Sequence, residues 1–110
     1  MNKVILTGRM TDEPTLIITK DDLAISNFTV AINSIREKAD FIRCTVFGEK
    51  AKVIAEYFKK GSGICVCGHL QNSQYEKDGV MVYGLDVIVD EFTFVDKKEV
   101  EEPKKSYKRR

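Results

Sequence analysis

The stretch DFIRCTVFGEKAKVIAEYFKKG at residues 40–61 decides the fold, because an alternating segment runs directly into a helical one. In residues 40–47, the side chains of Ile42, Cys44 and Val46 point one way and form an apolar set. Alternation with period two is typical of a strand that buries one face. This segment is therefore predicted to be a strand with its core face on these three residues.

The opposite face of the same strand has a different composition. It carries two aromatic rings, Phe41 and Phe47, with Arg43 and Thr45 between them. Core packing does not require two aromatics and an arginine on a second face. The pattern alone leaves two interpretations open, a binding surface and ordinary packing of strand aromatics, and packing is the commoner of the two.

A helix is predicted over Glu49–Lys60. Its apolar residues recur at i, i+3, i+4 and i+7, namely Ala51, Ile54, Ala55 and Phe58. Glu49 at the start and Lys59 and Lys60 at the end would complement the helix dipole. Gly61 is then expected to end the helix.

Strand patterns flank this unit on both sides. They cover Asn2–Arg9, Leu23–Asn33, Ile64–Tyr75 and Val80–Val95, with a shorter extended piece at 16–19. Ile64, Val66 and Leu70 are in phase, and Asp78-Gly79 predicts a hairpin turn. Five strands with one helix between the third and fourth predict a mainly all-β protein, a five-stranded OB-fold β-barrel.

Composition limits the class of protein. The chain has 110 residues, which suits one domain, and 43% of them are apolar, as in globular proteins. No segment reaches the roughly 18–20 apolar residues of a membrane span, and the N-terminus does not read as a signal peptide. We therefore expect a cytoplasmic protein that contacts no membrane and keeps its three cysteines reduced.

Charge is divided unevenly along the chain. Residues 96–110 hold seven Lys/Arg and four Asp/Glu, whereas residues 1–95 hold eleven and thirteen, so the net charge of the body is negative. We expect a folded domain over 1–95 and a charged, disordered tail over 96–110. Because the body is not broadly basic, any nucleic-acid binding must come from a local cluster and from stacking.

Several segments, in order, resemble the bacterial single-stranded DNA-binding proteins. They are Asn2–Arg9, Asn27–Ala31, Asp40–Gly48, Ala55–Ser62 and Gly68–Gln71, and the resemblance covers about residues 1–95. It implies an OB-fold that binds single-stranded DNA without sequence preference. It also implies a homo-oligomer, usually a tetramer with a dimer as the alternative, associated with the nucleoid in replication, recombination, repair or DNA uptake.

The resemblance also implies site residues. It places stacking aromatics at Phe41, Phe47 and Tyr75, and cations that contact the DNA backbone at Lys3, Arg43, Lys59 and Lys60. Arg36 stands near a position where the family usually has a further aromatic, and is a candidate to stack or to contact phosphate there. Stacking on an aromatic tolerates any base, and Lys and Arg neutralise phosphates without reading sequence.

Two departures from the family pattern bear on partners. The loop between the second and third long strands is shorter than usual, which predicts a smaller contact area with DNA. The acidic C-terminal tip through which the family recruits replication and repair proteins is absent from the sequence. A second hypothesis is therefore an OB-fold accessory protein, similar to primosomal replication protein N, that acts mainly by docking protein partners.

Catalysis and cofactors find little support. Cys65, Cys67 and His69 share one strand face, but a fourth zinc ligand is not evident because Cys44 lies in another phase. The resemblance implies a subunit interface here instead, since the family packs its subunits through this region of the sheet. The stretch 60–63 lacks the Gly-Lys-Ser/Thr of a phosphate-binding loop. We expect no enzyme activity, no metal and no cofactor.

Overall fold

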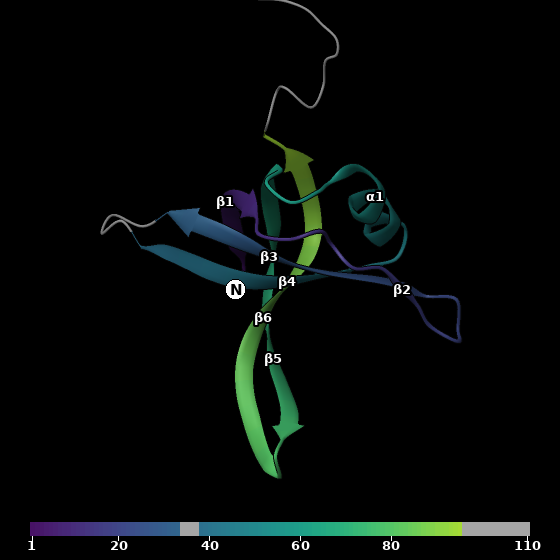
Figure 1. Cartoon of the computed structure of the whole chain (residues 1–110), viewed down its shortest axis with the longest axis vertical. Helices are drawn as coiled ribbons and strands as arrows, with labels where there is room; N and C mark the ends of the chain where they lie inside the picture. Colours follow the sequence, from purple (N-terminus) through teal and green to yellow (C-terminus); the bar gives the residue numbers. More distant parts are fainter. Residues whose placement is uncertain (34–37, 96–110) are drawn as a thin grey trace, which may run out of the picture.

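The structure is a computed structural model that describes residues 1–33 and 38–95. Its elements in chain order are β1 (Val4–Met10), β2 (Ile17–Ile18), β3 (Ala24–Asn33), β4 (Ala39–Phe47), α1 (Glu49–Tyr57), β5 (Gly63–Lys77) and β6 (Val80–Phe94) (Figure 1). None of the helical structure in these residues has the length and apolar character that crossing a bilayer takes.

Five of the strands form a closed ring in the order β1-β5-β6-β4-β3, and β1 closes it by pairing with β3. Neighbouring strands are antiparallel except β4 and β6, which are parallel and meet through two register pairs, Cys44 with Val87 and Thr45 with Ile88. The two-residue β2 adds an edge strand beside β3, outside the ring. The predicted OB-fold barrel with a helix between the third and fourth long strands is confirmed.

The core lies inside this ring and under α1. Alternation puts Phe28 and Val30 of β3 and Cys44 and Val46 of β4 inside, each less than 10% exposed, as the sequence pattern predicts. Beneath α1, the ring of Phe58 stacks on Phe94 with centroids 4.0 Å apart and meets Phe92 edge-on at 5.6 Å. Ala51 and Ile54 of α1 are fully buried against the barrel.

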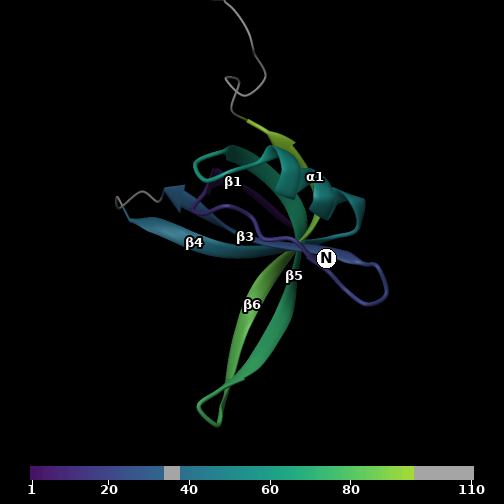
Figure 2. The same cartoon turned by 45° about the vertical axis from the view of Figure 1, so that its right-hand side comes forward.

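Beyond the barrel, β5 and β6 continue as a two-stranded arm that projects away from the ring in both views (Figures 1 and 2). The register between the two strands shifts at Cys67/Gly68. A Cβ at Gly68 would overlap the backbone oxygen of Ile88, so only glycine permits this close approach. Asp78 and Gly79 have φ of 54° and 80°, so the predicted hairpin turn is confirmed at the arm tip.

The predicted end of the helix is wrong. α1 ends at Tyr57, and Phe58 is extended, with φ −103° and ψ 151°. The extended backbone directs the Phe58 ring into the core, where burial outweighs another helical turn. Lys59 and Lys60 therefore lie beyond the helix and do not complement its dipole, and Gly61 does not terminate it.

Leu70 is in phase with Ile64 and Val66 but is 40% exposed, whereas those two residues are fully buried. Its register partner Val87 is still a core residue, whereas Leu85, the next residue of β6 on that side, is 58% exposed, so Leu70 lies where the core ends and the arm begins. The candidate Arg36 and the predicted tail at 96–110 lie outside the described residues.

Candidate nucleic-acid interface

The outward side chains of β3 and β4 form cross-strand rows, because residues directly opposite in an antiparallel pair share a face. We call this surface the outer face. Phe41 lies opposite Ala31, Arg43 opposite Thr29, Thr45 opposite Asn27, and Phe47 opposite Ile25. β1 and β2 extend the two end rows, since Arg9 lies opposite Ala31 and Ile17 opposite Ile25.

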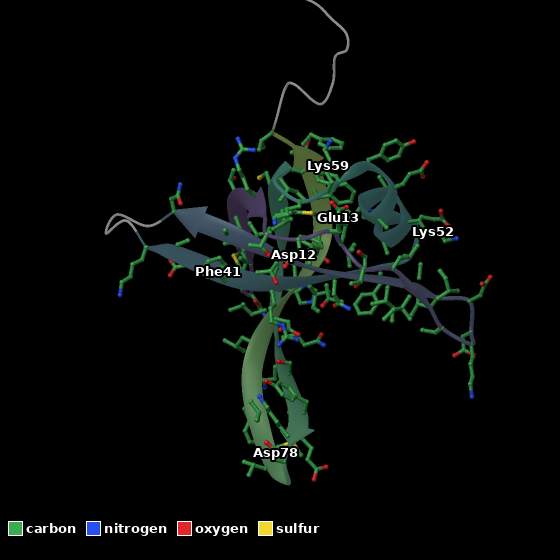
Figure 3. All side chains as sticks on the ribbon, in the orientation of Figure 1. Asp12, Glu13, Phe41, Lys52, Lys59 and Asp78 are labelled. Atoms are coloured by element: carbon green, nitrogen blue, oxygen red, sulfur yellow. The ribbon has the colours of Figure 1, made fainter. Side chains whose placement is uncertain are left out.

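The two phenylalanines of this face are exposed, which the core-packing alternative does not explain. Phe41 is 65% exposed and Phe47 is 43% exposed. Figure 3 shows Phe41 on β4, clear of the helix and of the arm tip at Asp78. Exposed aromatic side chains with a free ring face are what base stacking requires.

Arg43 lies between them and points toward the arm. Its side chain is 62% exposed, and its Nε lies 3.5 Å from Oδ1 of Asp86 on β6. Asp86 is only 16% exposed, so it is the more fixed partner. The pair links β4 to β6 and holds the guanidinium on the outer face, with most of its N–H donors directed to solvent.

Tyr75 lies on the arm, on the side that continues the outer face. Gln71 is opposite Asp86, and Tyr75, four residues further along, is opposite Val82. Four residues of strand place it about 13 Å beyond the Asp86 row. The structure therefore brings Phe41, Arg43 and Phe47 onto one surface and sets Tyr75, which is 47% exposed, apart on its extension.

The predicted lysines lie away from this centre. Lys3 directly precedes β1, whose first residue pairs with β5 at Gly68. Lys59 and Lys60 follow α1, and Figure 3 places Lys59 near Glu13 and apart from Phe41. The backbone N–H of Lys60 donates to Oε2 of Glu13 at 3.1 Å.

Arg9 lies in the Phe41 row of the outer face and Asp86 is paired with Arg43, and neither was singled out from the sequence. Arg9 extends the Phe41 row from β1, and its Nη1 donates to the carbonyl of Gly61 at 2.9 Å. Alternation along the first strand puts Arg9 on the same side as Ile5 and Thr7, so the sequence pattern could have indicated an outward side chain. Asp86 has no such signal, because its approach to Arg43 depends on the parallel pairing of β4 with β6.

A hollow of about 230 Å³ adjoins Arg43, between β3 and the loop after β1. Asp12, Glu13, Thr15 and Asn27 contribute to its wall. The acidic wall on one side and Asp86 on the other reduce the attraction of Arg43 for an anion. The positive field of this face is therefore weak, and apolar contact must supply much of any binding energy.

The thiols divide into two kinds. Burial, with a smaller contribution from the negative charge of Asp86, raises the pKa of Cys44 to about 12, so it is an inert core thiol. Cys65, Cys67 and His69 are partly exposed on the outward side of β5, as predicted, and His69 Nδ1 lies 3.2 Å from Asp90 Oδ2. Among residues 1–33 and 38–95, no three or more His, Cys, Asp or Glu residues gather as metal ligands would.

Comparison with known proteins gives one consistent result. The model of the single-strand binding protein family matches residues 1–95. The chain is 40% identical over 100 residues to the single-stranded DNA-binding protein of Clostridium perfringens, covering 87% of this chain and 67% of that protein. It is 41% identical over 106 residues to the protein of the same name from Fusobacterium nucleatum, with 89% and 69% covered.

Similarity extends to relatives of different length. The chain is 39% identical to the Bacillus cereus single-stranded DNA-binding protein but spans only 61% of it, and 36% identical to single-stranded DNA-binding protein 2 of Streptococcus agalactiae, of which it spans 79%. Both matches cover most of this chain, 87% and 88%. A family match over the whole barrel and identities near 40% confirm the resemblance, and the chain belongs to the single-strand binding protein family.

Proposed function

We propose that this chain binds single-stranded DNA without sequence preference, with bases stacked on the outer face and phosphates near Arg43. The observation that carries this proposal is the pair of exposed phenylalanines on β4, Phe41 and Phe47, on either side of an exposed arginine. Family membership supports a protein that binds and does not catalyse. The family resemblance further supports a cytoplasmic role in protecting single strands during replication, recombination, repair or uptake.

Stacking is the main source of affinity in this mechanism. A base on an aromatic ring contributes on the order of 1–3 kcal/mol and tolerates any base. Phe41 and Phe47 are the first stacking positions, and Tyr75 is a further one along the arm. Arg43 contacts phosphate as an anchor whose net charge is partly compensated by Asp86.

Binding of labelled oligo-dT, followed by fluorescence anisotropy at several salt concentrations, tests the proposal, with duplex DNA of equal length as control. We expect tight binding to the single strand, weakened by salt, and little binding to the duplex. Phe41→Ala should weaken binding about five- to 150-fold, the equivalent of one lost stack. Equal affinity for the duplex and the single strand would contradict the proposal.

The chain supplies a matched control for the aromatic substitution. Tyr83 is 72% exposed, comparable to Phe41, but register places it opposite Gln74, on the side of the arm that faces away from Tyr75. Tyr83→Ala should therefore leave the affinity for oligo-dT nearly unchanged, while Tyr75→Ala weakens it. An equal loss in both tyrosine variants would mean that the rings act through stability of the arm and not through stacking.

Docking of protein partners is the alternative function, and one observation favours it. Leu70, Met81, Tyr83 and Leu85 are 40–72% exposed on the side of the arm away from Tyr75. This side presents apolar surface and little charge, which suits a protein more than a phosphate backbone. Weak oligo-dT binding together with a dimeric mass in light scattering would favour this function over DNA protection.

Self-association is part of the proposal and follows the family resemblance. The outward side of β1 and β5 is the suggested contact, because Ile5 is 66% exposed and lies opposite the partly exposed Cys67. Light scattering on the wild type is expected to give a tetramer, or a dimer as the smaller assembly. Ile5→Glu should lower the mass, whereas a monomeric wild type would overturn this part.

A further inference from the structure

An apolar row crosses three strands at one end of the outer face. Phe47 on β4 lies opposite Ile25 on β3, and Ile25 lies opposite Ile17 on β2. Phe47 is 43% exposed and Ile17 is 53% exposed, so both ends of the row reach solvent. With strands about 4.8 Å apart, the row is roughly 10 Å long.

The row differs in chemistry from its neighbours. The adjacent row holds Thr45 and Asn27, whose side chains are hydrogen-bonded to each other at 2.8 Å, and the next holds Arg43. None of Phe47, Ile25 and Ile17 has a side-chain donor, acceptor or charge. A ligand meets only apolar surface here, so the features of a nucleotide that can be recognised are the flat base and the C5-methyl group of thymine.

We propose that Ile17 and Ile25 extend the single-strand interface from Phe47 onto β2, and that this row favours thymine over uracil through contact with the C5-methyl group. The inference rests on the proposed function, since a single strand must first occupy Phe47. The surface is continuous with the exposed ring of Phe47, and no phosphate-binding group interrupts it. A base stacked on Phe47 therefore has aliphatic carbon beside its edge, where a methyl group gains contact and a hydrogen does not.

Two adjacent isoleucines allow a closely matched test. Ile18 follows Ile17 in β2 and is 48% exposed, but it lies opposite the buried Ala24 and so points to the other side of the sheet. Ile17→Ala and Ile18→Ala remove the same atoms from neighbouring positions of one edge strand. Each variant is titrated with oligo-dT and with oligo-dU of equal length, which differ only in the methyl group.

The expected result separates the two variants. Ile17→Ala should weaken oligo-dT binding about three- to tenfold, and Ile18→Ala less than about twofold. The wild type should prefer oligo-dT to oligo-dU, and Ile17→Ala should reduce this preference while Ile18→Ala keeps it. Thermal unfolding and light scattering on the same samples check that fold and assembly are retained.

Other outcomes overturn the inference. Equal effects of the two substitutions, an unchanged preference for thymine in Ile17→Ala, or a change of molecular mass in that variant would each show that the row does not contact bases. In those cases the wild type still binds oligo-dT and the proposed function stands. A wild type that does not bind oligo-dT would instead overturn the proposed function, and this inference with it.

Discussion

Replacing Asp86 by asparagine should strengthen the binding of single-stranded DNA. Asp86 Oδ1 lies 3.5 Å from Arg43 Nε, so its carboxylate competes with a phosphate for the same guanidinium. A phosphate oxygen that accepts a hydrogen bond of about 2.8 Å on the solvent side of Arg43 would lie about 6 Å from that carboxylate, which is 3.5 Å from Nε on the other side. Two like charges at this distance repel by about 0.7 kcal/mol in bulk water, and by more near a surface of lower dielectric constant.

This repulsion translates into an affinity that can be measured. We expect Asp86→Asn to bind oligo-dT about three- to tenfold more tightly than the wild type at 0.1 M salt, by fluorescence anisotropy. The gain should shrink as salt rises, because screening weakens the repulsion. Asparagine has nearly the same size as aspartate, so the substitution leaves no cavity in the barrel beside Arg43.

Asp78→Asn is the control for net charge. It removes one negative charge at the arm tip, which the six strand steps from Val80 to Asp86 place about 20 Å away, well beyond the Debye length of about 10 Å at 0.1 M salt. Asparagine also tolerates the positive φ of 54° at this position. Equal gains in the two variants would mean that overall charge is responsible, and a weaker Asp86→Asn protein would mean that Asp86 orients Arg43 and does not compete for it.

Four further substitutions and the reactivity of one thiol test the fold. Gly68→Ala should lower the free energy of unfolding by at least about 2 kcal/mol in chemical denaturation, because its Cβ would overlap the backbone at Ile88. Gly84→Ala is the control and should cost less than about 1 kcal/mol, since its Cβ would meet only Ser73 Oγ at 3.4 Å. Similar losses in the two variants would contradict the close approach of Gly68 to the Ile88 backbone. Phe58→Ala should cost about 3–5 kcal/mol by the same measurement, since the ring is buried and stacked, and a cost below 1 kcal/mol would mean that it is not a core residue. The Cys44 thiol should react with a disulfide reagent only after unfolding, unlike the other two cysteines. Its pKa is raised from 9.0 to about 12, so the folded state holds the proton more tightly, and its contribution to stability is complete below pH 9 and declines between pH 9 and 12. Cys44→Ala should therefore remove part of the loss of stability in that range, and an unchanged pH profile would contradict the assignment.

Much of the barrel could be predicted because its strands alternate. The inward sets of β3 and β4 follow directly from period-two patterning, and Asp78-Gly79 fixes the arm turn through its positive φ values. The local pattern does not tell which strands pair with each other, since the pairing of β4 with β6 joins segments far apart in the chain. The link between Arg43 and Asp86 depends on that pairing.

The early end of the helix and the exposure of Leu70 share a physical cause. Helix periodicity continues through Phe58, but the ring gains more from stacking on Phe94 than from another turn. Leu70 has the phase of a core residue, yet phase says nothing about where a strand leaves the barrel. Local patterns determine which side of an element is apolar, and tertiary packing determines how far the element continues and whether that side is covered.

The parallel contact between β4 and β6 has a consequence for motion. Only two register pairs join these strands, whereas β5 and β6 share a ladder along their whole length. The amides of this short seam should exchange with deuterium sooner than those of the long ladder. Arg43 on β4 and Asp86 on β6 lie beside this seam, one on each strand. A bound DNA strand that spans them would hold β4 and β6 together and so reduce the opening of the barrel at this point.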